Sequence, residues 1–228
     1  MTNEQGFLFS QIVRILDWAY EKTQSGHFGW AGAGQLAQDY TRKFSNPDDA
    51  IDSLINWQTG SAGVAGFVTG VGGLWFLPIG VPANLASVLC IQLRMISAIA
   101  LIRGYSPRSD QVRTLAYASL CGAGASDVLK DVGTKIGTRI VVSASRETIM
   151  KINHRVGSRL LTKMGGTGAA NLGRMVPLIG GLVGGGIDAS ATKLIGVTAK
   201  RLFIQPDRGA SRWDGDQMRT EVGMPYDL

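Results

Sequence analysis

The polar side chains that are most able to take part in chemistry lie inside an apolar stretch of the sequence. Gln92 and Arg94 are embedded in the mostly apolar run of residues 88–101. A buried guanidinium needs a carboxylate or several carbonyl groups around it, because desolvating it alone is costly. Asp127 and Asp188, each at the edge of an apolar segment, are the candidate partners. The pattern predicts either a structural ion pair that fixes helix packing or a polar spot in a ligand groove.

Other polar residues extend this candidate cluster. Asp127 and Lys130 are three residues apart and share one side of a helix, where a surface ion pair is the simplest interpretation. Asn171 is typical of a helix cap or a turn. The complete set of ligand or polar-cluster candidates is Asn84, Gln92, Arg94, Asp127, Lys130, Lys135, Asn171, Asp188 and Lys193.

Several kinds of chemistry find no support in the motifs. The glycine-rich run of residues 181–186 is followed by Ile and Asp, whereas a phosphate-binding loop needs Lys and a hydroxyl residue there. Neither His27 nor His154 is accompanied by a sequence motif for a serine or cysteine nucleophile. The two histidines and two cysteines are too widely spaced for a zinc site. We therefore expect no metal and no cofactor.

The charges are unevenly distributed along the chain. Residues 53–93 contain no carboxylate, lysine, arginine or histidine, and this gap is rich in glycine. The net charge of +6 is concentrated further on, because nine basic residues lie between Lys130 and Arg174 against two acidic ones. A basic face attracts anionic lipid, nucleic acid or an acidic protein. The membrane-surface candidates are Arg139, Arg146, Lys151, Arg155, Arg159 and Lys163.

The hydrophobic periodicity predicts helices and no strands. We expect helices over 5–23, 34–43, 83–103, 110–121, 126–137, 138–164 and 187–203, with another that begins near Pro47 and a possible break near Asn153. The predicted fold is all-α, a single helical domain in which two Gly-rich apolar helical segments pack in the core. Its parts are N-terminal amphipathic helices (1–46), the main helical domain (47–204) and a polar, loosely ordered tail (205–228).

Two further features indicate the compartment. The N-terminus has no charged-then-apolar signal peptide and is amphipathic instead. Cys90 and Cys121 are flanked by apolar residues and are expected to be buried free thiols, which fits a reducing compartment. The sequence therefore predicts a cytoplasmic protein that is associated with a membrane.

A set of motifs in one order resembles the EcsC protein family. They include GFVTGVGGLWFLPIGVPANLASVLCIQLRMISAIALIRGYSP (66–107), INHRVGSRLLTKMG (152–165) and NLGRMVPLIGGLVGGGIDASATKLIG (171–196), and together the matches span roughly residues 47–204. The resemblance implies a mainly helical protein without an established catalytic site. The family is named for a bacterial protein encoded alongside an ABC transporter, so the resemblance also implies a membrane transporter as a partner.

These observations lead to one main functional hypothesis and two alternatives. We expect peripheral membrane association, binding of a lipid-like ligand, or both, with the Gly-rich segments dipping into lipid and the basic helix on anionic headgroups. One alternative is a hydrolase-type enzyme that uses Arg94, Asp127 and Asp188. The other is an integral membrane protein with a short apolar hairpin, although Pro78 interrupts one segment and Gln92 and Arg94 lie mid-helix in another. Nucleic-acid binding is disfavoured because the basic helix lacks interleaved aromatic residues.

Overall fold

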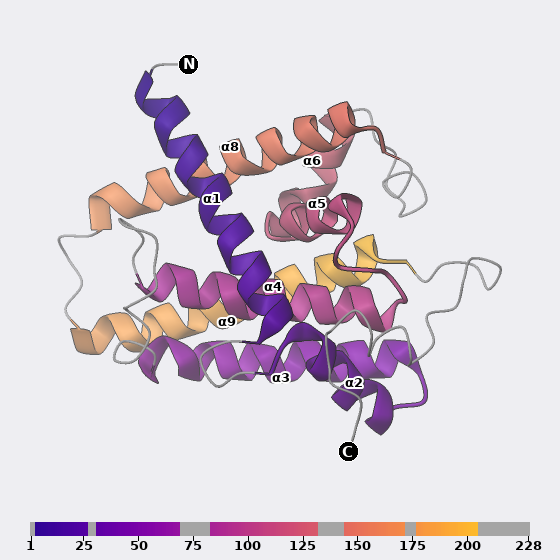
Figure 1. Cartoon of the computed structure of the whole chain (residues 1–228). Helices are drawn as coiled ribbons and strands as arrows, with labels where there is room; N and C mark the ends of the chain where they lie inside the picture. The colour runs from indigo at the N-terminus through magenta and orange to yellow at the C-terminus, as the bar shows by residue number, and fades with distance from the viewer. Residues whose placement is uncertain (1–2, 27–30, 69–82, 132–143, 172–176, 205–228) are drawn as a thin grey trace.

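The computed structural model describes residues 3–26, 31–68, 83–131, 144–171 and 177–204. Side chains are described for these residues except 3–9, 11, 61–68, 83–87, 161, 163–171 and 177–188, where the backbone alone is described. Every regular element in the described part of the chain is a helix, which confirms the all-α prediction (Figure 1). The remaining calls on residues 69–82, 132–143 and the tail from 205 lie outside the described residues.

The helices follow the predicted positions closely over the first two thirds of the chain. They are α1 (Asn3–Ser25), α2 (Ala33–Lys43), α3 (Pro47–Val68), α4 (Ala83–Ile102), α5 (Asp110–Ser119), a 3₁₀ turn η2 (Gly122–Gly124), α6 (Ala125–Asp131), α8 (Arg146–Asn171) and α9 (Pro177–Leu202). Periodicity and caps were sufficient here because both act within a few residues of chain.

Local capping explains several of these helix ends. Asn46 Oδ1 accepts a hydrogen bond from the Asp48 N–H at 3.0 Å, and Pro47 follows as the first helical residue of α3. Ser109 caps α5 in the same way, since its hydroxyl accepts from Val112 N–H at 3.2 Å. At the end of α4, Gly104 adopts a φ of 85°. A left-handed residue at this position closes the helix, which is why glycine stands there.

The central element of the fold is α4, which packs against α1, α2, α3, α5 and α9. From Cys90 to Arg103 each residue except Arg94 is buried. A helix that is apolar on all sides is one that neighbours surround. Burial therefore explains why the uncharged gap in the sequence continues into this helix.

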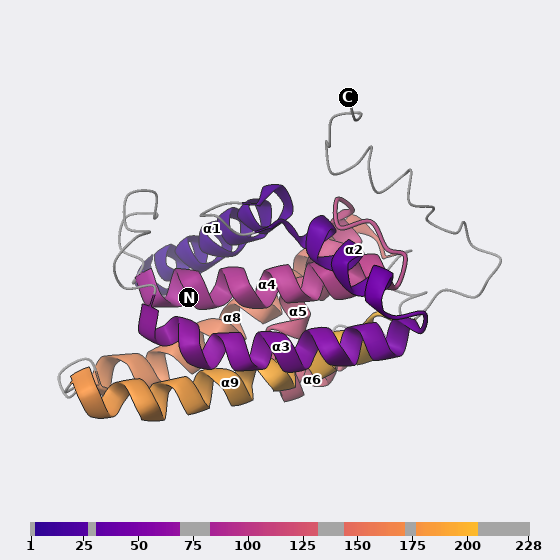
Figure 2. The same ribbon diagram turned by 90° about the horizontal axis from the view of Figure 1, so that it is seen from below.

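The other helices form the surroundings of α4 (Figures 1 and 2). Helices α3 and α9 lie side by side, and their close approach depends on Gly196, where a Cβ atom would stand 2.8 Å from Ile55 Cγ1. Helix α8 packs against α5, α1 and α6 on the other side of the molecule. Side chains of α1 and α2, including Tyr20 and Tyr40, belong to the same hydrophobic core as α4.

Two predicted helix boundaries differ from the structure. Helix α9 begins at Pro177, ten residues before the predicted start at 187, so the glycine-rich run is helical. Each interior glycine costs a helix about 1 kcal/mol, and packing against other helices can offset that cost. Helix α8 begins at Arg146 and runs without a break through Asn153 to Asn171, so the predicted break near Asn153 is wrong.

Candidate functional site

Gln92 and Arg94 both face neighbouring helices rather than solvent. Gln92 Nε2 donates to Thr192 Oγ1 of α9 at 3.3 Å, and both residues are buried. Arg94 donates from Nη1 to the carbonyl of Ala31 at 3.3 Å and from Nη2 to Oε1 of buried Gln58 at 3.5 Å. Burial lowers the pKa of Arg94. These contacts link α4 to α3, α9 and the segment before α2, which suits a packing role.

Asp127 interacts with α8 and not with Arg94. Its carboxylate accepts from Arg159 Nη2 at 3.2 Å, and Arg159 Nη1 also donates to the carbonyl of Gly124 at 3.1 Å. Both charged side chains are largely exposed. Since the carboxylate of Asp127 is held by Arg159, the structure does not assemble the Arg94 and Asp127 pair on which the hydrolase hypothesis depended.

The remaining cluster candidates are dispersed or lie outside the described part. Lys130 and Lys193 are exposed on α6 and α9, respectively. Asn84, Asn171 and Asp188 occupy helical backbone positions, and their side chains are outside the description, as is the whole of Lys135. Among the described residues, no three histidine, cysteine or acidic side chains gather as a metal site would require.

An ion-pair network that sequence reasoning missed joins α3, α4 and α9. Arg103 donates to both carboxylate oxygens of Asp48, at 2.8 and 3.4 Å. Lys200 Nζ lies 3.1 Å from Asp48 Oδ1 and 2.7 Å from Asp52 Oδ1. The hydrogen bonds from Arg103 and Lys200 hold the pKa of Asp48 below its ordinary value. The network lies at the helix termini and fixes how the three helices meet.

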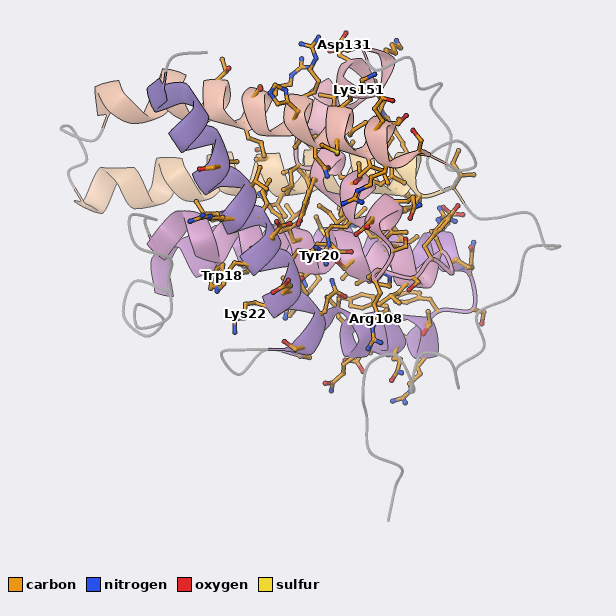
Figure 3. All side chains as sticks on the ribbon, turned by 45° about the horizontal axis from the view of Figure 1, so that its top comes forward. Trp18, Tyr20, Lys22, Arg108, Asp131 and Lys151 are labelled. Carbon is orange, nitrogen blue, oxygen red and sulfur yellow. The ribbon has the colours of Figure 1, made fainter. Side chains whose placement is uncertain are left out.

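The exposed part of α8 carries four basic side chains on more than one side of the helix, here called the basic face and defined as Arg146, Lys151, Arg155 and Arg159 with the apolar Met150. All five side chains are exposed, and Met150 keeps 64% of its surface accessible. Lys151 is paired with Glu147 at 2.7 Å and lies on the side of α8 that faces away from the core (Figure 3). Arg139 lies outside the described residues, and the Lys163 side chain is likewise not described. The predicted amphipathic character of this helix is therefore visible over residues 146–159.

One end of the bundle is built from helix ends without ionisable residues. Figures 1 and 2 place the end of α3, the start of α4, the end of α8 and the start of α9 at the same end of the molecule. We call residues 61–68, 83–87, 164–171 and 177–187 the uncharged end, since none of them is acidic, basic or histidine. The opposite termini are charged in the usual way, with acidic residues beginning α3 and α8 and basic residues ending α9.

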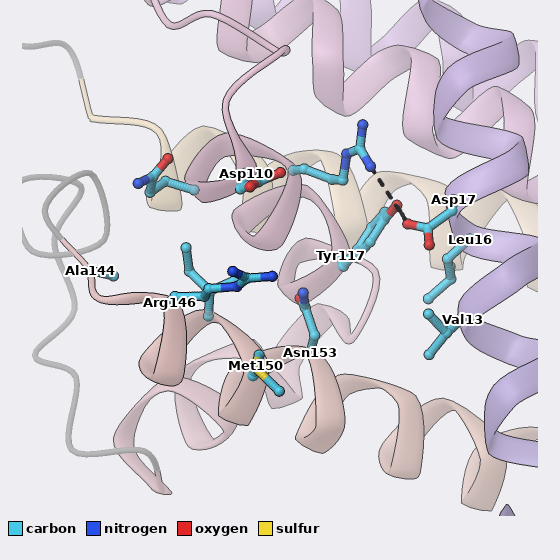
Figure 4. Close-up of a pocket in the computed structure, with 12 residues that line it drawn as sticks. Val13, Leu16, Asp17, Asp110, Tyr117, Ala144, Arg146, Met150 and Asn153 are labelled. Carbon is cyan, nitrogen blue, oxygen red and sulfur yellow. Dashed lines mark hydrogen bonds and ion pairs between the residues drawn. The ribbon is translucent and has the colours of Figure 1, made fainter.

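A pocket of about 620 Å³ opens between α1, α5 and α8 (Figure 4). Its apolar wall comes from Val13 and Leu16 of α1 and from Ile149 and Met150 of α8, and its remaining lining residues are Asp17, Asp110, Gln111, Arg113, Tyr117, Ala144, Arg146 and Asn153. The pocket was not predicted, because its walls come from segments that are far apart in the sequence. Two of its residues, Arg146 and Met150, also belong to the basic face.

A short polar chain lines the deeper side of this pocket. The Tyr117 hydroxyl donates to Asp17 Oδ1 at 2.6 Å, and Arg113 Nη1 lies 3.8 Å from the same oxygen. Burial and the hydrogen bond to Asp17 raise the pKa of Tyr117, so the phenol stays protonated. The Arg113 guanidinium also stands over the Tyr20 ring at 5.2 Å. The arrangement suits recognition of a polar ligand better than proton abstraction by tyrosine.

Two remaining observations concern the thiols and the membrane. Cys90 is buried as expected, whereas Cys121 is half-buried, and the two thiols do not form a disulfide. Burial raises the pKa of Cys90 to about 11, so its thiol is protonated and a poor nucleophile. Of the helices in the described ranges, none combines the length and the apolar character that crossing a bilayer demands.

The fold is thus an all-helical domain with an uncharged end, a basic helix face and one amphiphilic pocket. The family model for the EcsC protein family matches residues 12–205. The chain belongs to the EcsC protein family, as the motifs in its sequence indicated. The match includes α2 and most of α1, which contribute to the common core. No curated protein and no solved structure matches the chain significantly.

Proposed function

We propose that this protein associates peripherally with the cytoplasmic face of an anionic membrane, with the uncharged end inserted to the boundary between the lipid headgroups and the acyl chains. The observation that carries the proposal is the convergence of two separate Gly-rich apolar sequences at one end of the bundle. Helix termini normally gain stability from charged side chains that complement the helix dipole. Four termini without such residues are suited to an environment in which charged side chains are costly.

The connections at this end support the same proposal. Residues 69–82 and 172–176 join the four helix ends, and their only ionisable residue is Arg174. Small and apolar residues allow shallow insertion, and a single arginine is compatible with anionic headgroups. Helix-packing contacts account for Gln92 and Arg94, so the membrane proposal does not depend on either residue.

The basic face of α8 supplies the electrostatic part. It occupies the first half of α8, whose C-terminal end belongs to the uncharged end, and Arg159 is its member nearest to that end. Each basic residue near an anionic surface contributes about 1 kcal/mol of binding, and salt weakens that attraction. The thiols of Cys90 and Cys121, neither of them in a disulfide, favour a reducing compartment and hence the cytoplasmic side.

Flotation with vesicles tests the insertion. We expect the protein to float with phosphatidylcholine vesicles that contain phosphatidylglycerol, and Leu182→Asp in the uncharged end to reduce flotation at least about tenfold, given the cost of roughly 2–3 kcal/mol for a buried aspartate in lipid. The matched control is Leu194→Asp on the same helix, because Leu194 is already exposed at the surface and lies outside the uncharged end. Equal flotation of the two variants, both folded by circular dichroism, would contradict insertion.

Charge reversal tests the basic face separately. Arg155→Glu should weaken flotation by roughly 10- to 30-fold at low salt and much less at high salt, because it replaces attraction by repulsion at one exposed site. Arg42→Glu makes the same change in net charge on α2, away from the basic face. If both variants lose binding equally, net charge alone governs the interaction and the assignment to α8 is wrong.

A further inference from the structure

The pocket between α1, α5 and α8 carries one charge of each sign that has no ion-pair partner among the described residues. Arg146 and Asp110 line opposite helices, α8 and α5, and neither forms an ion pair within the described part of the chain. Asp17 and Arg113, by contrast, interact with each other and with the tyrosines Tyr117 and Tyr20. The charges left for a ligand are therefore one guanidinium and one carboxylate.

Two enclosed polar atoms of the pocket residues also lack partners. Arg113 Nε is a donor and Asn153 Oδ1 is an acceptor, and both are shielded from solvent without a hydrogen bond in the described structure. Figure 4 shows Asn153 in the wall formed by α8, with Arg146 beside it. Unsatisfied buried groups of this kind are rare, and because both atoms are shielded in the ligand-free pocket, a ligand forms the missing bonds only once the Arg113 and Asn153 side chains rotate toward it.

The apolar wall completes the requirements on the ligand. Val13 and Leu16 of α1 line the pocket together with Ile149 and Met150 of α8, and Met150 is also exposed at the surface. The volume of about 620 Å³ falls within the range of roughly 300–1,000 Å³ that is typical of small-molecule sites. A ligand with an anionic group, a cationic group with N–H donors and an adjoining apolar part matches all of these features.

We propose that the pocket binds the zwitterionic headgroup of an amphiphile that combines a phosphate ester with an ammonium group. Arg146 pairs with the phosphate, which also accepts from Arg113 Nε. The ammonium group lies toward Asp110 and donates to Asn153 Oδ1. The first apolar carbons rest against Leu16, Ile149 and their neighbours in the apolar wall.

The test uses a soluble short-chain lipid with the full-length protein. Dihexanoyl phosphatidylethanolamine below its micellar concentration should bind saturably in calorimetry, with one site per chain. Dihexanoyl phosphatidylglycerol, which has the phosphate but no ammonium group, should bind several-fold more weakly. O-phosphoethanolamine is then added as a competitor to distinguish the source of the headgroup. Strong displacement of the lipid indicates that the natural ligand is a free phosphate ester, and weak displacement indicates a lipid. Either result agrees with binding of a zwitterionic group in the pocket.

Two variants locate the site within the pocket. Asp110→Asn should weaken binding of the ethanolamine lipid by up to about fivefold, and Asn153→Leu by about five- to tenfold. Asp131→Asn is the matched control, since it removes the same charge from an exposed position on α6 outside the pocket. Neither pocket variant should change vesicle flotation. A failure of the ligand proposal can therefore be distinguished from a failure of the membrane proposal. Equal affinity for the two lipids, or unchanged affinity in folded Asp110→Asn, would overturn the inference.

Discussion

The pairing of Arg103 with Asp48 leads to an asymmetric prediction about stability. Arg103 is 8% exposed, whereas Asp48 is 50% exposed and has Lys200 as a second partner. Asp48→Ala leaves a buried guanidinium without its bidentate acceptor. Arg103→Met keeps an apolar stem in the core and leaves a carboxylate that water and Lys200 can satisfy. We therefore expect the removal of the more exposed partner to be the more destabilising change.

The magnitudes follow from the exposure of each group. Breaking a fully buried pair costs about 3–5 kcal/mol, and the half-exposed carboxylate reduces this to about 2–3 kcal/mol for Asp48→Ala. Arg103→Met should cost about 1 kcal/mol, because its exposed former partner remains solvated. For a chain of this size the two changes correspond to melting-temperature shifts of roughly 4–12 °C and 2–4 °C.

Thermal and urea unfolding followed by circular dichroism measures these differences. Asp49→Ala is the matched control, because Asp49 stands beside Asp48 in the first turn of α3 and is exposed. It should lose only the interaction with the helix dipole, about 0.3–1 kcal/mol. An Asp48→Ala protein no less stable than the Asp49→Ala protein, or an Arg103→Met protein less stable than both, would refute the argument.

The pH dependence provides a second check on the same pair. The pKa of Asp48 is lowered from 3.8 in the folded protein, so the unfolded chain takes up the proton first as the pH falls. The stabilisation is complete above about pH 4 and is lost as the pH falls through the depressed folded-state pKa. The stability difference between wild type and Asp48→Ala should therefore be constant from pH 5 to 7 and should shrink in more acidic solution.

Two further predictions concern a pair of glycines and a thiol. Gly196→Ala should destabilise the protein by about 1–2 kcal/mol, because the new Cβ would lie 2.8 Å from Ile55 and overpack the contact between α3 and α9. A Cβ at Gly60 would have nothing within 4 Å, so Gly60→Ala should stabilise the protein by about 0.5–1 kcal/mol in the same unfolding assay. Stability changes of the same sign for both variants would contradict the close approach at Gly196. Cys90, whose pKa is raised to about 11, should resist alkylation at pH 8 in the native protein. Mass spectrometry of the labelled protein should show that half-buried Cys121 reacts first. Rapid labelling of Cys90 in folded protein would show that α4 is more accessible than the structure indicates.

The extent of sequence-based prediction differed between elements for identifiable reasons. The helix starts at Pro47 and Asp110 were readable because Asn46 and Ser109 provide caps within three residues of chain. The start of α9 was missed because its glycines resemble a loop when the helices that pack against them are not known. Arg146 and Arg155 are both exposed on α8, and their role at a membrane surface stays a prediction.

By itself, the sequence determined the all-α class, most helix boundaries and the family, because periodicity, capping and ordered motifs are properties of neighbouring residues. Only the tertiary structure decided which of these helices meet. Asp17 and Tyr117 are 100 residues apart, yet their side chains join in one pocket. The Gly-rich ends of α3 and α9 converge, and Asp127 pairs with Arg159 rather than Arg94. Such contacts depend on how whole helix faces pack. A pattern of local spacing does not show which other helix a given face will pack against.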